Sequence, residues 1–480
     1  MTTHLHFTLP RKEIVDRILI PKFYDPDLSE AVSSASSDFD LPTLGSLLLP
    51  GKAGSQLGIW LPRENYGSGE VPFVRTSDLY HWRIRPDFKK GVSQEVYERY
   101  AARSDVKVGD ILFVAHGTYL IGDVAVVEEK DVPLLLQDHV FRLRVRPDSG
   151  VHPYLLLAAL STKFVRRQVR ARQFSAEILD KIGERHVGIR VPIPKSKKTR
   201  SALIEKVAAV LAHHREVRER IAEVGSARST PGPRAGSHYG FRQKRSTLKN
   251  RILIPRYYDP ELEAEIAEAE AQERGGWVSI SELAAKGLIE VSTGVEVGKM
   301  AYGTGDIPFM RTSDIVDWEL FRDPTQGVSQ KIYDDYSPKG VLAENDVVLV
   351  RDGTYLVGSS ALVLDEDLPA LFCGGIYRLR SPDPKAMSPH ALLGLLNLPL
   401  VKRQLRAKQF TRDVIDTLGP RFLEVRVPPP TSRLAAEMAT RVRAVMERKA
   451  EIKRGMSQVV ELAEPVVPPS AVGRPGWSMR

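Results

Sequence analysis

The phrase Pro-Phe-x-Arg-Thr-Ser-Asp occurs twice in the chain, at 72–78 and again at 308–314. Arginine can bind phosphate or the acceptor edge of guanine, and serine and threonine hydroxyls can donate to phosphate oxygens. The same residues could instead form a buried Arg–Asp pair with a hydroxyl capping the next segment. Two copies of a phrase that contacted different bases would differ at the contact residues, so an identical phrase favours structure or phosphate contact. The residues concerned are Arg75, Thr76, Ser77, Arg311, Thr312 and Ser313.

The phrase belongs to a much longer internal repeat. "RILIPKFYDPDL" from Arg17 corresponds to "RILIPRYYDPEL" from Arg251, and "GTYLIG" from Gly117 corresponds to "GTYLVG" from Gly353. From the Arg-Thr-Ser-Asp phrase onward the register holds without a gap as far as "IRVPIP" and "VRVPPP". Such a register indicates a tandem duplication.

Positions where the register holds but the chemistry changes are better candidates for base contacts. Arginine, glutamine and histidine can read the edges of bases in the major groove. Ordinary drift of surface loops after duplication is at least as frequent an explanation for any single position. The candidates, with the shared Thr-Tyr pairs beside them, are His81, Arg83, His116, Thr118, Tyr119, Gln137, His139, Arg351, Asp352, Thr354 and Tyr355.

A basic segment expected to be helical follows in each copy, "RRQVRARQF" from Arg166 and "KRQLRAKQF" from Lys402. Phosphate contact would explain this face, and a solvated charged face explains it equally well. The candidate phosphate contacts are Arg167, Arg170, Arg403 and Arg406.

The sequence predicts no catalysis and no metal site in this chain. It has no Walker A loop, no glycine-rich methyl-donor loop and no Asp/Asn-Pro-Pro-aromatic motif, and no Asp/Glu/His set stands at metal-ligand spacing. A nuclease-like set could be assembled from Pro86, Asp87, Glu128 and Lys130. The second copy keeps only the aspartate, as Asp323, so the set is broken there.

The elements expected to position these residues are α+β. Short Val/Ile/Leu-rich runs separated by turn residues predict strands, and each copy ends in a longer segment with heptad spacing. One explanation is that each closing helix packs on its own domain. We favour pairing of the two helices, because a narrow apolar stripe suits a helix partner, with His214 and Lys449 as polar interruptions that fix register. The seam positions are Leu203, Val207, Val210, Val217, Ile221, Val224, Met438, Val442, Val445, Ile452, Met456 and Val459.

Bulk composition bounds the class of protein. The chain has 480 residues, a net charge of +9, a pI near 9.4 and one cysteine, Cys373. The moderate basic excess permits nucleic-acid binding, and the lone cysteine excludes a disulfide framework and fits a reducing cytoplasm. With neither a signal peptide nor a long apolar run, the expected location is cytoplasmic.

The order of domain, helix, domain, helix resembles the specificity subunit of type I restriction-modification systems. Three sequence features add to the resemblance: "IPFMRTSDI", the "GD-I-L…GT…G" segment, and the "VPIP" or "VPPP" before each helix. The resemblance implies two target recognition domains that each read half of a split DNA sequence, and two long helices that pair antiparallel with pseudo-two-fold symmetry. A helix from 200 to 224 would be about 37 Å long, close to one turn of B-DNA. It also implies two copies of an adenine DNA methyltransferase, which would carry S-adenosylmethionine, and a restriction, translocase or other defence subunit. The "RILIP(K/R)(F/Y)YDP" element and the longer linker depart from the family.

The expected boundaries are a first recognition domain at 1–195, its helix at 196–224, a linker at 225–250, a second recognition domain at 251–431, its helix at 432–462 and a tail at 463–480. The function expected is a non-catalytic, sequence-specific DNA-binding subunit of a restriction-modification or related antiphage complex. Two alternatives stay open: a two-domain regulator without a methylase, and a structural scaffold that links two enzyme subunits without reading sequence.

Overall fold

The computed structural model describes residues 10–14, 18–35, 38–117, 120–176, 179–226, 242–249, 252–353, 356–412 and 415–466. The chain divides into two compact units, Met1–His214 with Glu451–Met479 (unit 1) and Arg215–Ala450 (unit 2). Each long helix therefore contributes residues to both units, whereas the boundaries expected from sequence kept each helix whole. Among the described residues, no helix is long and apolar enough to cross a membrane.

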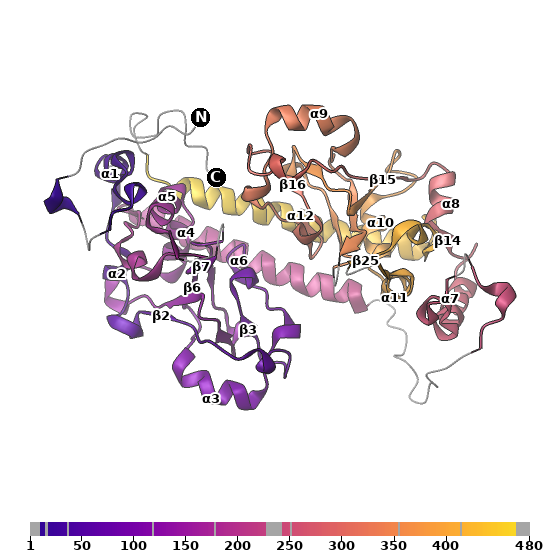
Figure 1. The fold of residues 1–480 in the computed structure, drawn as a ribbon, viewed down its shortest axis with the longest axis horizontal. Helices are drawn as coiled ribbons and strands as arrows, with labels where there is room; N and C mark the ends of the chain where they lie inside the picture. The colour runs from indigo at the N-terminus through magenta and orange to yellow at the C-terminus, as the bar shows by residue number, and fades with distance from the viewer. Residues whose placement is uncertain are drawn as a thin grey trace. The chain divides into compact units, whose positions relative to one another are not determined.

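Unit 1 is built on a four-stranded antiparallel sheet in the order β2-β10-β6-β8. Strand β6 has the sequence Ile-Leu-Phe-Val and is buried along its whole length, as expected for a strand covered on both faces. Helix α4 packs on β8 (Figure 1). The strands are β1 (Phe39–Asp40), β2 (Ser55–Leu57), β3 (Phe73–Val74), β4 (Leu79–Tyr80), β5 (Arg83–Ile84), β6 (Ile111–Val114), β7 (His116–Gly117), β8 (Val124–Val126), β9 (Leu135–Leu136), β10 (Val140–Leu143), β11 (Phe174–Ala176), β12 (Leu179–Lys181) and β13 (Ile193–Pro194). The helices before the long one are α1 (Pro26–Ser33), α2 (Leu44–Leu47), α3 (Gln94–Ser104), α4 (Pro153–Leu160) and α5 (Lys163–Arg172).

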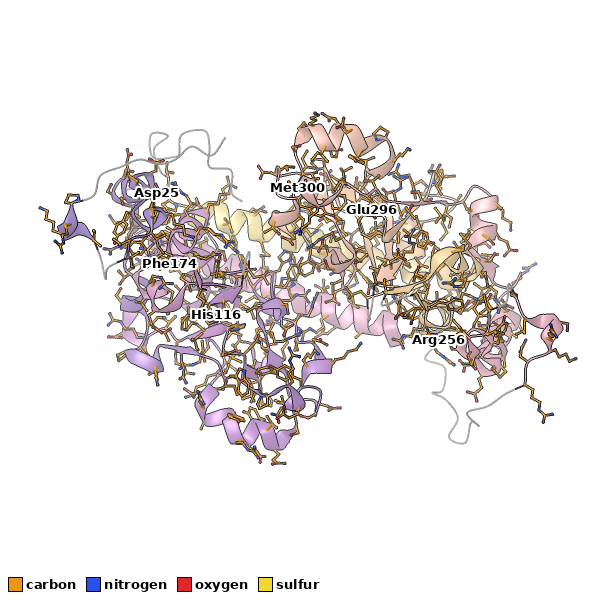
Figure 2. All side chains as sticks on the ribbon, in the orientation of Figure 1. Asp25, His116, Phe174, Arg256, Glu296 and Met300 are labelled. Carbon is orange, nitrogen blue, oxygen red and sulfur yellow. The ribbon has the colours of Figure 1, made fainter. Side chains whose placement is uncertain are left out.

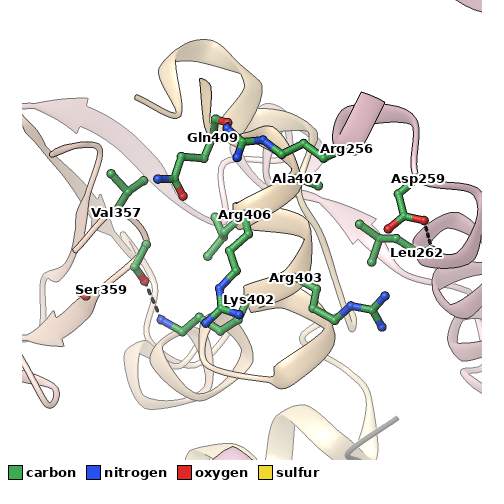
Figure 3. A pocket seen from close by; sticks show the side chains of 12 residues that line it. Arg256, Asp259, Leu262, Val357, Ser359, Lys402, Arg403, Arg406, Ala407 and Gln409 are labelled. Atoms are coloured by element: carbon green, nitrogen blue, oxygen red, sulfur yellow. Dashed lines mark hydrogen bonds between the residues drawn. The ribbon is translucent and has the colours of Figure 1, made fainter. Parts of the chain in front are cut away.

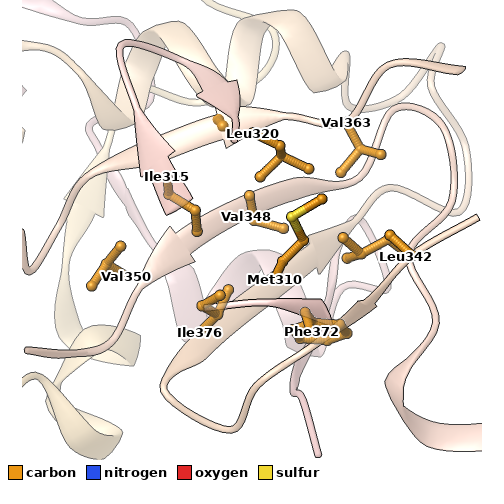
Figure 4. Packing of buried hydrophobic residues seen from close by; sticks show 11 residues of the cluster. Met310, Ile315, Leu320, Leu342, Val348, Val350, Val363, Phe372 and Ile376 are labelled. Carbon is orange, nitrogen blue, oxygen red and sulfur yellow. The ribbon is translucent and has the colours of Figure 1, made fainter. Parts of the chain in front are cut away.

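Unit 2 repeats this plan, with a sheet in the order β15-β23-β19-β21. Figure 4 shows an apolar cluster of this unit, in which Met310, Val348 and Phe372 pack from three different strands. The strands are β14 (Val278–Ser279), β15 (Glu290–Thr293), β16 (Phe309–Met310), β17 (Ile315–Val316), β18 (Glu319–Leu320), β19 (Val347–Val350), β20 (Asp352–Gly353), β21 (Ser360–Leu362), β22 (Leu371–Phe372), β23 (Ile376–Arg380), β24 (Phe410–Arg412), β25 (Ile415–Thr417) and β26 (Arg426–Val427). The helices are α7 (Pro260–Gln272), α8 (Ile280–Ala285), α9 (Gln330–Gly340), α10 (Pro389–Leu396) and α11 (Pro399–Lys408).

The two long helices, α6 (Lys197–Ser226) and α12 (Arg433–Ala463), pack together as expected. In unit 1, Lys206 Nζ donates to Gln458 Oε1 at 3.0 Å, and a Cβ on Gly455 would lie 2.8 Å from a Val210 methyl. Residue numbers rise along one helix as they fall along the other, so the pairing is antiparallel. In unit 2, Arg448 Nε lies 2.8 Å from Glu216 Oε2.

Ten of the twelve expected seam residues are buried, and the other two, Ile221 and Met456, are half-buried. Part of this seam faces the globular part of its own unit. A Cβ on Gly394 of α10 would lie 2.8 Å from Met438 Cβ and 3.0 Å from a Val442 methyl. The two explanations that the heptad pattern left open are therefore both true, because one stripe serves both contacts.

One of the two polar interruptions of the seam, Lys449, makes a contact that the heptad pattern could not show. Lys449 is 1% exposed and forms an ion pair with Glu319 of β18, which is 4% exposed. It thus joins the long helix to a hairpin of its own unit, because a buried ammonium needs a charged partner that the apolar seam does not supply.

An acceptor from far along the chain caps helix α5. The amides of Lys163 and Phe164 each donate to a carboxylate oxygen of Glu464 at 2.7 Å, and Thr162 caps the same end locally. The carboxylate lies at the positive end of the helix dipole. The region just beyond α12 is therefore part of unit 1.

Candidate nucleic-acid interface

The repeated Arg-Thr-Ser-Asp phrase forms an ion-paired turn. Arg75 donates from Nε and Nη2 to both carboxylate oxygens of Asp78 at 3.1 and 3.0 Å, and Nη2 lies 3.4 Å from Asp87 Oδ2. The second copy matches it, with Arg311 Nη2 at 2.8 Å from Asp323 Oδ2. The identity of the two phrases thus has a structural cause, which was one of the two explanations that the sequence favoured.

The carboxylates in this turn are held by backbone as well as by arginine. The Arg311 amide donates to Asp314 Oδ2 at 2.8 Å, and Ser313 Oγ donates to Oδ1 at 2.8 Å. Burial raises the pKa of Asp314, and these hydrogen bonds and the Arg311 charge oppose the rise. Thr76 and Thr312 are half-buried in the same turns, and Ser77 is exposed.

Two candidate reading residues, His81 and Arg83, lie at the tight hairpin turn between β4 and β5. His81 and Trp82 have φ values of 46° and 69°, and Trp82 Nε1 donates to Ser161 Oγ at 2.8 Å. The turn directs Arg83 inward, where it is 5% exposed, and His81 stacks on Tyr80 with ring centroids 3.7 Å apart. Because Arg83 is buried, we leave it out of the proposed base contacts.

The remaining variable residues of unit 1 lie together on β7 and in the turn between β9 and β10. We call this part of the unit its variable edge. His116 is on β7, which pairs with β12, and its ring centroid lies 4.9 Å from that of His139 (Figure 2 labels His116). His139 Nε2 lies 3.9 Å from Asp138 Oδ1, and the adjacent Gln137 bridges the chain at Ile59. Burial, the second histidine and Lys181 lower the pKa of His116 to about 4. This ring is therefore neutral at pH 7 and offers one donor and one acceptor.

The matching edge of unit 2 has different chemistry. Arg351 Nε donates to Asp352 Oδ2 at 2.8 Å, and Thr417 Oγ1 donates to Asp352 Oδ1 at 2.6 Å. The turn Cys373–Gly375 replaces Gln137–His139, and a Cβ on Gly375 would lie 2.8 Å from the Thr312 methyl. Burial raises the pKa of Cys373 to about 11, so the thiol is protonated at neutral pH. One backbone frame therefore presents two imidazoles in one unit and an arginine–aspartate pair in the other.

The sequence comparison missed an exposed aromatic residue beside this edge. Trp60 follows Ile59 and is 69% exposed, and the same register places Glu296 opposite it in unit 2. Met300, four residues after Glu296, is 90% exposed (Figure 2). Extending the register comparison upstream of the Arg-Thr-Ser-Asp phrase would have found the Trp60–Glu296 difference.

The basic helices α5 and α11 use part of their charge inside each unit. Arg170 Nη1 donates to Gln173 Oε1 at 2.7 Å, and Arg403 pairs with Glu265. Arg167 is half-buried, and Arg406 is exposed. Neither a solvated charged face nor a phosphate-binding face alone therefore accounts for the basic residues of these two helices.

Four candidates, Thr118, Tyr119, Thr354 and Tyr355, lie outside the described residues. Of the nuclease-like set, Asp87 is bound by Arg75, and Glu128 Oε2 lies 2.8 Å from Lys130 Nζ. Within the described part of the chain, no group of three His, Cys, Asp or Glu side chains is placed to hold a metal ion.

Comparisons with known proteins give matches in solved structures only. The type I restriction-modification S subunit from M. genitalium aligns at 12% identity, with a TM-score of 0.36, over 88% of this chain and 94% of that chain. The HsdS subunit from Thermoanaerobacter tengcongensis aligns at 17% identity and a TM-score of 0.28, over 89% of this chain and 95% of that one. A chain from a structure of the type I R-M system aligns at 18% identity, with a TM-score of 0.28, over 89% of this chain and 98% of that chain. No protein-family model and no curated protein matches the chain. With TM-scores below 0.5, the functional interpretation depends on the chain's own residues and geometry.

Proposed function

We propose that the protein is a sequence-specific DNA-binding specificity subunit of a type I-like restriction-modification or related antiphage complex. Each unit would read one half of a split duplex target. The paired helices would join the two readers and dock adenine methyltransferase subunits, which would bring S-adenosylmethionine. One observation supports the proposal most directly. The variable edge has the same backbone structure in both units but carries different polar side chains.

The side chains at this edge suit base recognition. A neutral imidazole can accept from or donate to a base edge, glutamine can bind adenine through two hydrogen bonds, and arginine can do the same with guanine. His116, Gln137 and His139 in unit 1, and Arg351 and Asp352 in unit 2, would therefore select different half-sites. The net charge of +9 supports binding to the phosphate backbone.

Each unit also exposes a leucine at the same point of the repeat. Leu19 and Leu253 are both 77% exposed, and both lie in the "RILIP" element. Two equivalent apolar contacts suit two copies of one partner. Replacing both leucines with aspartate should lower the amount of a copurifying partner subunit other than the methyltransferase, measured by quantitative mass spectrometry of the purified complex, while DNA binding by the remaining subunits persists.

Selection from random duplex DNA, performed with the chain and the proteins that copurify with it, tests the main proposal. The expected result is one motif with two short half-sites and a fixed gap. His139→Ala should change preference in one half-site, and Arg351→Ala in the other, so each variant is the control for the other. Each lost base contact should reduce discrimination by about 1–3 kcal/mol.

Insertion of one heptad into both long helices tests the spacer role, because it should change the gap and leave both half-sites as they were. If no motif is enriched while a large partner copurifies, the protein is a scaffold. If a motif is enriched and no methyltransferase is associated, it is a two-domain regulator.

A further inference from the structure

A basic pocket in unit 2 lies apart from the edge described above. Its volume is about 630 Å³, within the range of small-molecule sites. It is formed by the short helix Pro255–Tyr258, the start of α7, the turn before β21 and one face of α11. Figure 3 shows Arg256, Lys402 and Arg406 among its lining residues.

The three cations have few internal partners. Lys402 Nζ donates to the Gly358 carbonyl at 2.6 Å, and Arg256 donates to the Gln409 carbonyl. In the described part of the chain no carboxylate forms an ion pair with Lys402, Arg256 or Arg406. The lining carboxylate, Asp259, accepts from the amides of Glu261 and Leu262 at the start of α7, and Arg403 pairs with Glu265 outside the lining.

Unit 1 lacks this excess of positive charge at the equivalent place. Arg166 occupies the position of Lys402, and its Nη2 lies 2.5 Å from Asp123 Oδ1. Unit 2 has Ser359 where unit 1 has Asp123. The same fold thus neutralises the cation in unit 1 and leaves it available in unit 2.

The backbone of the turn is held close to α11. Gly358 has a φ of +85°, and a Cβ there would lie 3.3 Å from a Leu405 methyl. Gly122 has the equivalent conformation and contact with Val169 in unit 1. The turn that supplies Ser359 and the Gly358 carbonyl is therefore in a fixed position beside Lys402.

We propose that this pocket binds a phosphate-bearing ligand through Lys402, Arg406 and Arg256, with the Ser359 hydroxyl as a further donor. Cations in a concave, partly desolvated site bind phosphate oxygens through charge-assisted hydrogen bonds. Burial, which lowers the pKa of Lys402 to about 8, fits a cation that an incoming anion would stabilise. The phosphate could belong to a free nucleotide or to a nucleic-acid strand.

The test uses Ser359→Asp, which installs the carboxylate that unit 1 carries at Asp123. Calorimetric titration of the full complex with pyrophosphate, with a nucleoside triphosphate and with a short DNA duplex would measure binding. We expect Ser359→Asp to weaken binding roughly tenfold or more, because Lys402 would then pair internally. Ser337→Asp on α9 has the same charge change outside the pocket and should bind as the wild type does.

Arg406→Gln is a second variant at an exposed position, where folding is not at risk, and it should weaken the same ligand. Weakened pyrophosphate or triphosphate binding in both pocket variants supports a free phosphorylated ligand. Weakened duplex binding alone, with the selected DNA motif unchanged, supports a backbone phosphate. Wild-type affinity for all three probes in both variants, or no binding of any probe by the wild type, overturns the proposal. The motif selection is a separate measurement, so the two proposals can fail independently.

Discussion

The buried pair of Lys449 and Glu319 gives a quantitative prediction. Both side chains are almost completely buried, and they join α12 to the β17–β18 hairpin of unit 2. Glu319→Gln removes the carboxylate charge that pairs with the buried ammonium of Lys449. Removing one partner of a buried pair costs about 3–5 kcal/mol.

That cost can be converted to a change in melting temperature. For a unit of this size, 1 kcal/mol shifts Tm by about 2–4 °C, so Glu319→Gln should lower the transition of unit 2 by about 6–20 °C. Glu319→Leu combined with Lys449→Met replaces both charges by apolar groups and should recover most of the loss. The two positions are in contact, so their effects should be non-additive.

Differential scanning calorimetry of the wild type, Glu319→Gln, the single variants Glu319→Leu and Lys449→Met, and the double variant would measure this. Hydrogen exchange of α12 peptides would assign the transition to unit 2. The reasoning is refuted if either single variant melts within about 2 °C of the wild type. It is also refuted if the double variant loses as much stability as the two single variants combined.

Three further predictions concern other contacts. Gly394→Leu should destabilise unit 2 by about 1–3 kcal/mol because α10 approaches α12 too closely for a side chain. A lowered urea midpoint would show this, with Gly188→Leu as the control, because a Cβ there would meet no atom within 4 Å. Glu464→Ala should cost about 0.5–2 kcal/mol by uncapping α5, with faster hydrogen exchange at the Phe164 amide; unchanged exchange there would contradict the capping role. Burial lowers the pKa of His116 and of His390 to about 4, so between pH 4 and 6.5 the unfolded chain binds more protons than the folded one. Stability should therefore be complete above pH 6.5 and fall as the pH drops toward 4, and replacing both histidines with glutamine should flatten this dependence in urea titrations at pH 7 and 5.

The duplication, the mixed helix and strand content and the paired helices could be predicted from the sequence. Each leaves a periodic signal: a fixed offset between the repeats, alternating runs in strands and heptads in helices. The heptads could not show that Met438 and Val442 also pack against α10, since burial against a helix and burial against a domain select the same residue types.

Other features depend on pairs of residues that are distant in sequence. The partner of Lys449 lies 130 residues away, so no local pattern marks it. The cationic helices α5 and α11 look alike in sequence, and the difference between them depends on Asp123 and Ser359, which come from a separate turn. Arg83 was a reasonable reading candidate by residue type, but the hairpin turn at His81 and Trp82 buries it.

The carboxylate cap on α5 has a consequence for the growing chain on the ribosome. The Phe164 amide and Glu464 are 300 residues apart. At about 5–20 residues per second, roughly 15–60 s of translation separate the helix from its cap. During that interval the apolar side of α6 in unit 1 also lacks the last part of α12. Unit 1 therefore cannot complete its fold until the entire second unit has been synthesised.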